Sequence, residues 1–181
     1  MTRENRGETP PPYPHGNRGE TPPPYPHAEL VSFVLREARL LDEKRFDEWY
    51  ELFTEDAYYW VPLVPGQTDP LAHNSLAYED KLLLKLRIER LKLPTAYAQK
   101  PASRCHHVMQ LPEVEKTDEE RCEYVLRTPF IYTETRGDES QRYAATAWHT
   151  LVRAPAGLRI RLKRVDILNA DAALPSTQLF L

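Results

Sequence analysis

Hydrophobic residues in the first half of the chain recur with the period of a helix. The first such stretch spans residues 28–45, where apolar side chains stand three or four positions apart: Leu30, Val34, Ala38 and Leu41. Residues 46–53 repeat this spacing with aromatic side chains, which predicts a short second helix. Residues 76–93 predict a third helix, which Pro94 ends. Between the last two, residues 57–64 are rich in aromatic and β-branched side chains and predict a strand.

From about Ser103 onward, the pattern is that of strands separated by short polar turns. Four strands are predicted, over residues 104–110, 121–134, 142–153 and 157–168. The turns expected at residues 135–140 and 154–157 each contain a glycine. Helices followed by long consecutive strands indicate an α+β domain, in which the helices pack on one face of a curved antiparallel sheet to form a cone.

The last predicted strand changes phase along its length. Leu158, Ile160 and Leu162 alternate with basic residues, which is the two-residue period of a half-buried strand. The apolar positions then shift by one, to Val165 and Ile167. We expect either a β-bulge or burial on both faces of the strand to account for this shift.

The first 27 residues differ in composition from the rest. The string NRGETPPPYPH occurs at residues 5–15 and again at 17–27, and the segment contains eight of the 17 prolines but no Leu, Ile, Val, Phe or Trp. Such a segment buries too little apolar surface to offset the entropy of ordering it. We therefore predict a disordered tail over residues 1–27 and a domain over residues 28–181. The alternative is a proline-motif adaptor, since Pro-Pro-Pro-Tyr is similar to peptides that bind aromatic grooves.

Composition excludes several classes of function. The net charge of −3 argues against a nucleic-acid or anionic-membrane binder, because both need a basic excess. No apolar run approaches the length of a membrane span. With only Cys105 and Cys122, the chain has no disulfide framework, which favours the reducing cytoplasm.

The spacing of histidine and cysteine does not predict a metal centre. His106 and His107 are adjacent on a predicted strand, so their side chains are expected on opposite faces. The two cysteines are far apart and form no Cys-x-x-Cys pair, so the chain alone is not expected to ligate an iron–sulfur cluster. One enzymatic alternative stays open, a stand-alone isomerase, dehydratase or small-molecule-binding protein that uses the cone interior. Its acid–base pair would combine Asp166 with one of four residues: His107, His149, Tyr58 or Tyr132.

Several stretches together resemble the small (beta) subunits of bacterial aromatic-ring-hydroxylating dioxygenases. In chain order they are REARLLDEKRFDEW, EDAYYWVPL, YEDKLLLKLRIERL, AYAQKPASRCHHV, KRVDIL and the final LFL. The resemblance covers residues 28–181 and implies an NTF2-like α+β cone. It also implies a homotrimer of this chain that caps three alpha subunits, an α3β3 complex. The Rieske [2Fe–2S] cluster, the mononuclear Fe(II) and the substrate pocket would belong to the alpha subunit, with electrons arriving from NAD(P)H through reductase and ferredoxin partners.

On this resemblance, the chain binds no cofactor and contributes subunit contacts. We predict that six residues lie at those contacts: Trp60, Arg104, His106, His107, Arg164 and Asp166. Arginine and aromatic side chains are enriched at such surfaces. One departure is His106, which stands where family members commonly have an arginine. A bidentate ion pair of that arginine would become a weaker, pH-sensitive contact of His106.

Overall fold

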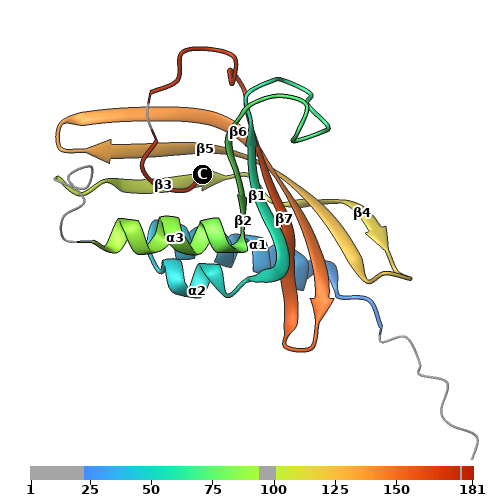
Figure 1. The fold of residues 1–181 in the computed structure, drawn as a ribbon. Coiled ribbons are helices and arrows are strands. Elements are labelled where there is room, and N and C mark those ends of the chain that lie inside the picture. Colours follow the sequence, from blue (N-terminus) through green and yellow to red (C-terminus); the bar gives the residue numbers. More distant parts are fainter. Residues whose placement is uncertain (1–22, 94–100, 176) are drawn as a thin grey trace, which may run out of the picture.

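The helices of the described residues, three in all, lie on one side of a long, curved sheet (Figure 1). The structure, a computed structural model, describes residues 23–93, 101–175 and 177–181. The elements in chain order are α1 (His27–Asp42), α2 (Phe46–Tyr50), β1 (Phe53–Pro62), β2 (Ser75–Asp80), α3 (Lys81–Lys92), β3 (Arg104–Met109), β4 (Glu113–Asp118), β5 (Glu123–Arg136), β6 (Glu139–Ala154) and β7 (Gly157–Ile167). The α+β arrangement predicted from the sequence is confirmed.

The sheet has the strand order β2-β1-β7-β6-β5-β3, and β4 also pairs with β5, along a different stretch from β3. All neighbouring strands are antiparallel except β1 and β7, which are parallel. The sheet is therefore mixed rather than wholly antiparallel. After β1 the chain passes through β2, α3 and the strands β3 to β6, and only then does β7 return to lie beside β1. Gly137 adopts a positive φ of 61° in the tight turn between β5 and β6, where a side chain would be strained.

A β-bulge in β7 accounts for the change of phase seen in the sequence. Thr150 of β6 pairs with Leu162, but the next residue, Leu151, pairs with Ile160, so Arg161 is the extra residue. Arg161 is exposed, whereas Ile160 and Lys163, on either side of it, are both buried. The bulge thus turns two out-of-phase sets of side chains toward the same core. It is the first of the two explanations that the sequence left open for the shift.

Two of the element predictions were wrong in part. Residues 75–80 form β2, and α3 begins only at Lys81 because the Asp80 side chain accepts a hydrogen bond from the Leu83 amide and caps the helix there. The second helix ends at Tyr50, and Phe53 already begins β1. Strand β4 was missed, because its largely exposed, polar residues carry no apolar alternation.

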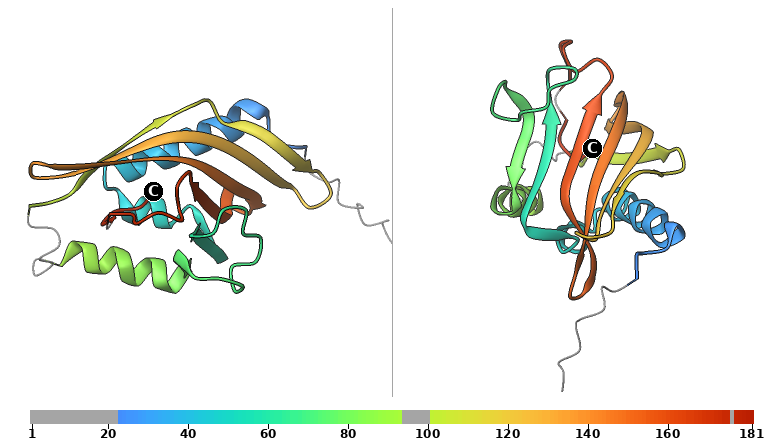
Figure 2. Two further views of the ribbon diagram at one scale, coloured as in Figure 1. Left: turned by 90° about the horizontal axis from the view of Figure 1, so that it is seen from above. Right: turned by 90° about the vertical axis from the view of Figure 1, so that its right-hand side faces the viewer.

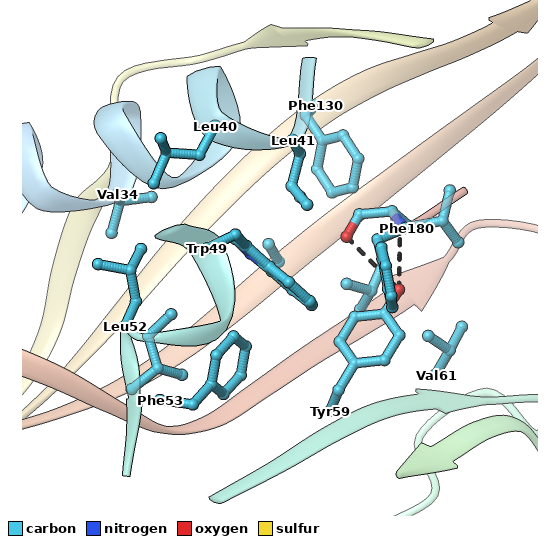
Figure 3. Close-up of a cluster of buried hydrophobic side chains, with 14 of the residues drawn as sticks. Val34, Leu40, Leu41, Trp49, Leu52, Phe53, Tyr59, Val61, Phe130 and Phe180 are labelled. Carbon is cyan, nitrogen blue, oxygen red and sulfur yellow. Dashed lines mark hydrogen bonds between the residues drawn. The ribbon is translucent and has the colours of Figure 1, made fainter. Parts of the chain in front are cut away.

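The core lies between the helices and the concave side of the sheet. Figure 3 shows it as a cluster in which the indole of Trp49 stands among other rings. Its ring centroid lies 4.8 Å from that of Phe53, 6.2 Å from that of Tyr59 and 4.5 Å from that of Phe180. Because α1 adds Val34 and Leu41 from the other side, the interior of the cone is filled by side chains.

The residues before α1 also contact the sheet. The Tyr25 amide donates a hydrogen bond of 3.0 Å to the Tyr124 hydroxyl, and the Arg153 guanidinium lies 4.1 Å from the Tyr25 ring. Residues 23–27, which the sequence analysis assigned to the tail, therefore contact the domain. The rest of that tail, residues 1–22, lies outside the described residues, so its disorder stays a prediction.

Candidate subunit interface

The outer face of the sheet, away from the helices, carries a continuous row of paired residues. Strand pairing aligns six positions from β4 to β2: Glu113, Arg127, Trp148, Arg164, Trp60 and Tyr78. We call this set the arginine–tryptophan row. Side chains alternate along a strand, so the neighbours of these residues, such as Tyr59 and Val165, point into the core.

Cations and aromatic rings alternate along the row. The Arg164 guanidinium lies 4.5 Å from the centroid of the Trp60 ring, and that of Arg127 lies 6.0 Å from the Trp148 ring. Trp60 in turn meets Tyr78 edge-on, with centroids 6.4 Å apart. These distances suit cation–π and edge-to-face contacts, so each side chain in the row restrains the next.

Polar partners within the chain fix the two indoles and the guanidinium. Asp166 accepts hydrogen bonds from Arg164 Nε at 2.7 Å and from Trp148 Nε1 at 3.0 Å. Trp60 Nε1 donates to Ser75 Oγ at 2.9 Å. Both indole N–H groups are satisfied internally, and Trp60 is only 4% exposed beneath Arg164. The row therefore presents Arg164 and Trp148, held rigidly from below and from the side, to whatever covers it. A surface already in its bound conformation loses little side-chain entropy on association.

Asp166 also lines a cavity beside the row, which we call the apolar hollow. It has a volume of about 560 Å³ and lies between the β1–β2 loop and the outer sides of β5 and β6. Its walls include three exposed apolar side chains: Val108, Ile131 and Leu168. Rigid aromatic and arginine side chains beside an apolar cavity are typical of the central part of a protein–protein interface.

The six contact residues predicted from the sequence separate into two groups. Trp60, Arg164 and Asp166 lie together, on β1 and β7. Arg104, His106 and His107 lie on β3, at the far edge of the sheet. Sequence reasoning missed Arg127, Trp148 and Tyr78, because only the strand register shows that they continue the row.

The two histidines of β3 lie on opposite faces, as expected. The His106 side chain is 72% exposed and that of His107 is 3% exposed. Both nevertheless contact Asp42, at the end of α1: His107 Nδ1 is 2.7 Å from Oδ1, and His106 Nδ1 is 3.0 Å from Oδ2. The His107 amide also donates to this carboxylate, at 3.1 Å. Asp42 thereby ties α1 to β3.

The acid–base pair considered for the cone interior does not assemble. Asp166 is on the outer face, where it binds Arg164 and Trp148. His107, His149 and Tyr132 point to the core side instead, and Tyr132 donates its hydroxyl hydrogen to Glu134 at 2.9 Å. The sheet itself therefore separates the carboxylate from these three partners. Tyr58 is exposed and stacks on Tyr78 at 4.8 Å.

A charged cluster that the sequence analysis did not identify lies inside the core. Glu37 Oε1 accepts hydrogen bonds from Lys163 Nζ at 2.7 Å and from the indole of Trp49. His149 Nε2 lies 3.5 Å from Glu37 Oε2, and His149 Nδ1 has no hydrogen-bond partner within the described part of the chain. The out-of-phase position of Lys163 in β7 was the only signal in the sequence.

Burial and charge act against each other in this cluster. Burial by itself would raise the pKa of Glu37, but Lys163 and His149 outweigh it and hold the pKa of this carboxyl far below its ordinary value. Burial lowers the pKa of His149, so its ring is neutral at pH 7. The cluster is a neutral combination of Glu37 anion and Lys163 cation, and it joins α1 to the sheet.

The described part of the chain contains neither a metal-binding cluster nor a membrane-spanning helix. Among residues 23–93, 101–175 and 177–181, no group of three or more His, Cys, Asp or Glu side chains is arranged to hold a metal ion. Both cysteines are free thiols, and burial raises the pKa of Cys105 to about 12. None of the helices in these same ranges has the length and apolar character needed to cross a membrane.

Comparison with known families gives one match that covers most of the chain. Residues 36–172 match the family described as ring hydroxylating beta subunit. The small subunit of 2-halobenzoate 1,2-dioxygenase from Burkholderia cepacia is 32% identical over 146 residues, which cover 78% of this chain and 87% of that one. The small oxygenase component of the p-cumate 2,3-dioxygenase system of Pseudomonas putida is 31% identical over 150 residues, with 82% of each chain covered.

Solved structures show the same fold. The beta subunit of benzoate 1,2-dioxygenase from Burkholderia mallei superposes with a TM-score of 0.68 and 24% identity, over 86% of this chain and 97% of that one. An NTF2-like protein from Novosphingobium aromaticivorans superposes with a TM-score of 0.53 and 19% identity, over 81% and 84% of the two chains. The NTF2-like cone predicted from the sequence is thus confirmed.

Proposed function

The chain belongs to the ring-hydroxylating beta-subunit family, and on that premise we propose that it is an assembly subunit without catalytic residues of its own. Its partner in this proposal is the alpha subunit of an aromatic-ring-hydroxylating dioxygenase. The alpha subunit inserts oxygen from O₂ into an aromatic compound, and this chain holds the complex together. The match over residues 36–172 is the observation that carries the proposal.

The cofactors belong to the alpha subunit in this proposal. A Rieske [2Fe–2S] cluster needs two cysteines and two histidines around two iron atoms. Cys105 pairs with Glu134 near one end of β5, and Cys122 precedes Glu123 at the other. At about 3.3 Å per residue, the two positions are roughly 40 Å apart along the strand. The thiols of this chain therefore do not fit the cluster, and the mononuclear Fe(II) is assigned to the alpha subunit as well.

The complex is an α3β3 assembly in which three copies of this chain form a homotrimer. A closed ring of three needs two different surfaces on each copy, because its contacts run head to tail. This chain has two separate regions rich in interface residue types: the arginine–tryptophan row with the apolar hollow, and the β3 edge with the exposed Arg104 and His106. His107, which is buried against Asp42, supports the β3 edge from the core side. We assign the row and hollow to the alpha subunit and the β3 edge to the neighbouring copy. An obligate assembly of this kind buries roughly 2,000 Å² or more in total.

The location follows from the same chemistry. The alpha subunit receives electrons from NAD(P)H through reductase and ferredoxin proteins, which places the complex in the cytoplasm. The two free cysteines agree with a reducing compartment. The contents of the cone interior weigh against the stand-alone isomerase, dehydratase or binding protein, because Phe180 occupies the space that a substrate would need.

Co-purification tests the proposal. The chain is expressed with a tagged alpha subunit encoded beside its own gene, and the tagged protein is purified. We expect a coloured complex with equal amounts of both chains, and oxygen uptake that depends on an aromatic substrate and on NAD(P)H. The chain purified alone should consume no oxygen. Failure of the two chains to co-purify, or turnover by this chain alone, would contradict the proposal.

A further inference from the structure

Residues 177–181 fold back into the cone, between the sheet and α3 (Figure 2). Leu179, Phe180 and Leu181 are at most 2% exposed. The Phe180 ring is surrounded by groups from three elements, as Figure 3 shows in part. Its centroid lies 5.6 Å from that of Phe46, 4.5 Å from that of Trp49 and 5.8 Å from that of Tyr59. The Arg87 guanidinium of α3 lies 4.4 Å from the same ring.

The backbone of this segment is held by side chains rather than by a neighbouring strand. Glu134, itself 3% exposed, accepts hydrogen bonds from the Gln178 amide at 3.2 Å and from the Leu179 amide at 3.5 Å. Arg87 donates to the Leu179 carbonyl at 3.0 Å, and the Leu181 amide donates to the Tyr59 hydroxyl at 3.1 Å. Enclosure by apolar walls with a few placed polar groups is how proteins bind small ligands.

We propose that the interior of the cone is a binding site for a single neutral aromatic ring, and that Phe180 is its built-in occupant. Three aromatic side chains and one guanidinium line the position of the ring. Arg87 is already paired with Glu79 at 3.3 Å and donates to the Leu179 carbonyl, so its charge is not available for an anionic ligand. The ligand is therefore neutral. This inference is independent of the subunit contacts proposed above, since none of these residues belongs to the arginine–tryptophan row.

Phe180→Ala tests the proposal in the full-length chain. The substitution removes the ring and leaves the backbone hydrogen bonds of the segment available. An apolar cavity of about 150 Å³ stays dry and takes up benzene, so fluorobenzene, followed by ¹⁹F NMR, is a suitable probe. We expect the variant to bind fluorobenzene at least tenfold more tightly than the unaltered chain, and its melting temperature to rise with probe concentration. 4-Fluorobenzoate should bind at least tenfold more weakly than fluorobenzene.

Phe33→Ala is the matched control. Phe33 is also buried, but it lines an open depression with Tyr25 and Arg36, so its removal creates no enclosed space. Equal binding of fluorobenzene by the two folded variants, or no binding by folded Phe180→Ala, overturns the proposal. If Phe180→Ala does not fold alone, it is refolded with saturating fluorobenzene. Recovery of the native circular dichroism spectrum then supports the proposal, and a chain that stays unfolded contradicts it.

Discussion

Glu37 of α1 and Lys163 of β7 form an ion pair inside the core, with Oε1 and Nζ 2.7 Å apart and side chains 1% and 3% exposed. Lys163 reaches this position only because the bulge at Arg161 turns the second half of β7 over. Such a pair gains little over well-packed apolar residues, since both charges lose their hydration. Breaking it is costly, because one buried charge is left alone.

Lys163→Met should therefore be strongly destabilising. It leaves the Glu37 carboxylate buried with only Trp49 and a neutral His149 beside it. We expect a loss of about 3–5 kcal/mol in the free energy of unfolding, measured by urea denaturation at pH 7. Glu37→Gln combined with Lys163→Met should lose less than Lys163→Met alone. Lys85→Met is the control, because Lys85 is 43% exposed on α3 and should change stability little.

Equal stability of the single and double variants would mean that the isolated charge is not the cause of the loss. The comparison needs the same slope of unfolding free energy against urea in all variants, because a changed slope reports a changed unfolded or native state. The chain is measured without its partner subunits, since a partner that binds only the folded state would add to its apparent stability.

His149 should make the isolated chain less stable as the pH falls below neutrality. Burial depresses its folded pKa below the ordinary value of 6.5, so the unfolded chain binds this proton first. The stability that this group contributes is fully present above pH 6.5 and is lost as the pH falls toward the folded pKa. The slope reaches at most about 1.4 kcal/mol per pH unit.

The measurement is the free energy of unfolding between pH 7.5 and pH 5 for the unaltered chain and for His149→Gln. Glutamine carries no titrating proton, and its amide still donates to Glu37, so we expect a flatter profile. His106→Gln serves as the control, because the His106 side chain is 72% exposed and the slope due to His149 should persist. A profile for His149→Gln as steep as that of the unaltered chain would assign the pH dependence to another group.

Much of the fold could be predicted from the sequence, because the spacing of apolar residues differs between helices and strands and can be read locally. The family resemblance and the α+β cone are confirmed, and the bulge is one of the two explanations that the shift from Leu158 and Ile160 to Val165 and Ile167 left open. Residues 76–80 were assigned to a helix, because nothing in the apolar spacing separates Leu76 from the helix that follows. The Asp80 side chain, which caps α3, was the available boundary signal.

The candidate sites were less predictable, since they depend on long-range pairing. Trp60, Arg164 and Asp166 were chosen by residue type and turn out to be neighbours. Trp148 belongs with them only because of the register between β6 and β7. The ion pair of Glu37 and Lys163 joins residues 126 positions apart. The local pattern gives Lys163 the phase of Val165 and Ile167, but it does not identify Glu37 as the partner.

Arg164→Ala should weaken binding to the alpha subunit more than it weakens the fold. The guanidinium covers Trp60 and binds Asp166, so its loss removes a rigid part of the proposed contact. At the centre of an interface such a truncation costs about 2 kcal/mol or more, roughly a 30-fold weaker affinity. The dissociation constant is measured by sedimentation or calorimetry, alongside the melting temperature of the isolated chain.

Arg121→Ala is the matched control for this experiment, because Arg121 is 80% exposed in the turn between β4 and β5. Arg164→Lys adds a finer test, because it keeps the charge but loses the planar group that lies over Trp60. Its affinity for the alpha subunit should fall between those of Arg164→Ala and Arg121→Ala. If Arg164→Ala and Arg121→Ala bind the alpha subunit equally well, the row is not the contact surface.

Glu134→Ala should release residues 177–179 without unfolding the sheet. The carboxylate accepts the amides of Gln178 and Leu179, and apart from these it is bound by the Tyr132 hydroxyl at 2.9 Å. Its removal leaves the buried Leu179 amide without this acceptor, at about 1–3 kcal/mol, and the part-buried Gln178 amide at a smaller cost. Amide hydrogen exchange should accelerate at Gln178 and Leu179 but not at Leu126 in the middle of β5. Glu139→Ala is the control, because the Glu139 side chain is 82% exposed. If exchange at Gln178 and Leu179 stays as slow in Glu134→Ala as in Glu139→Ala, then Glu134 does not hold the segment, and the contacts of Phe180 with the hydrogen bonds of Arg87 and Tyr59 do.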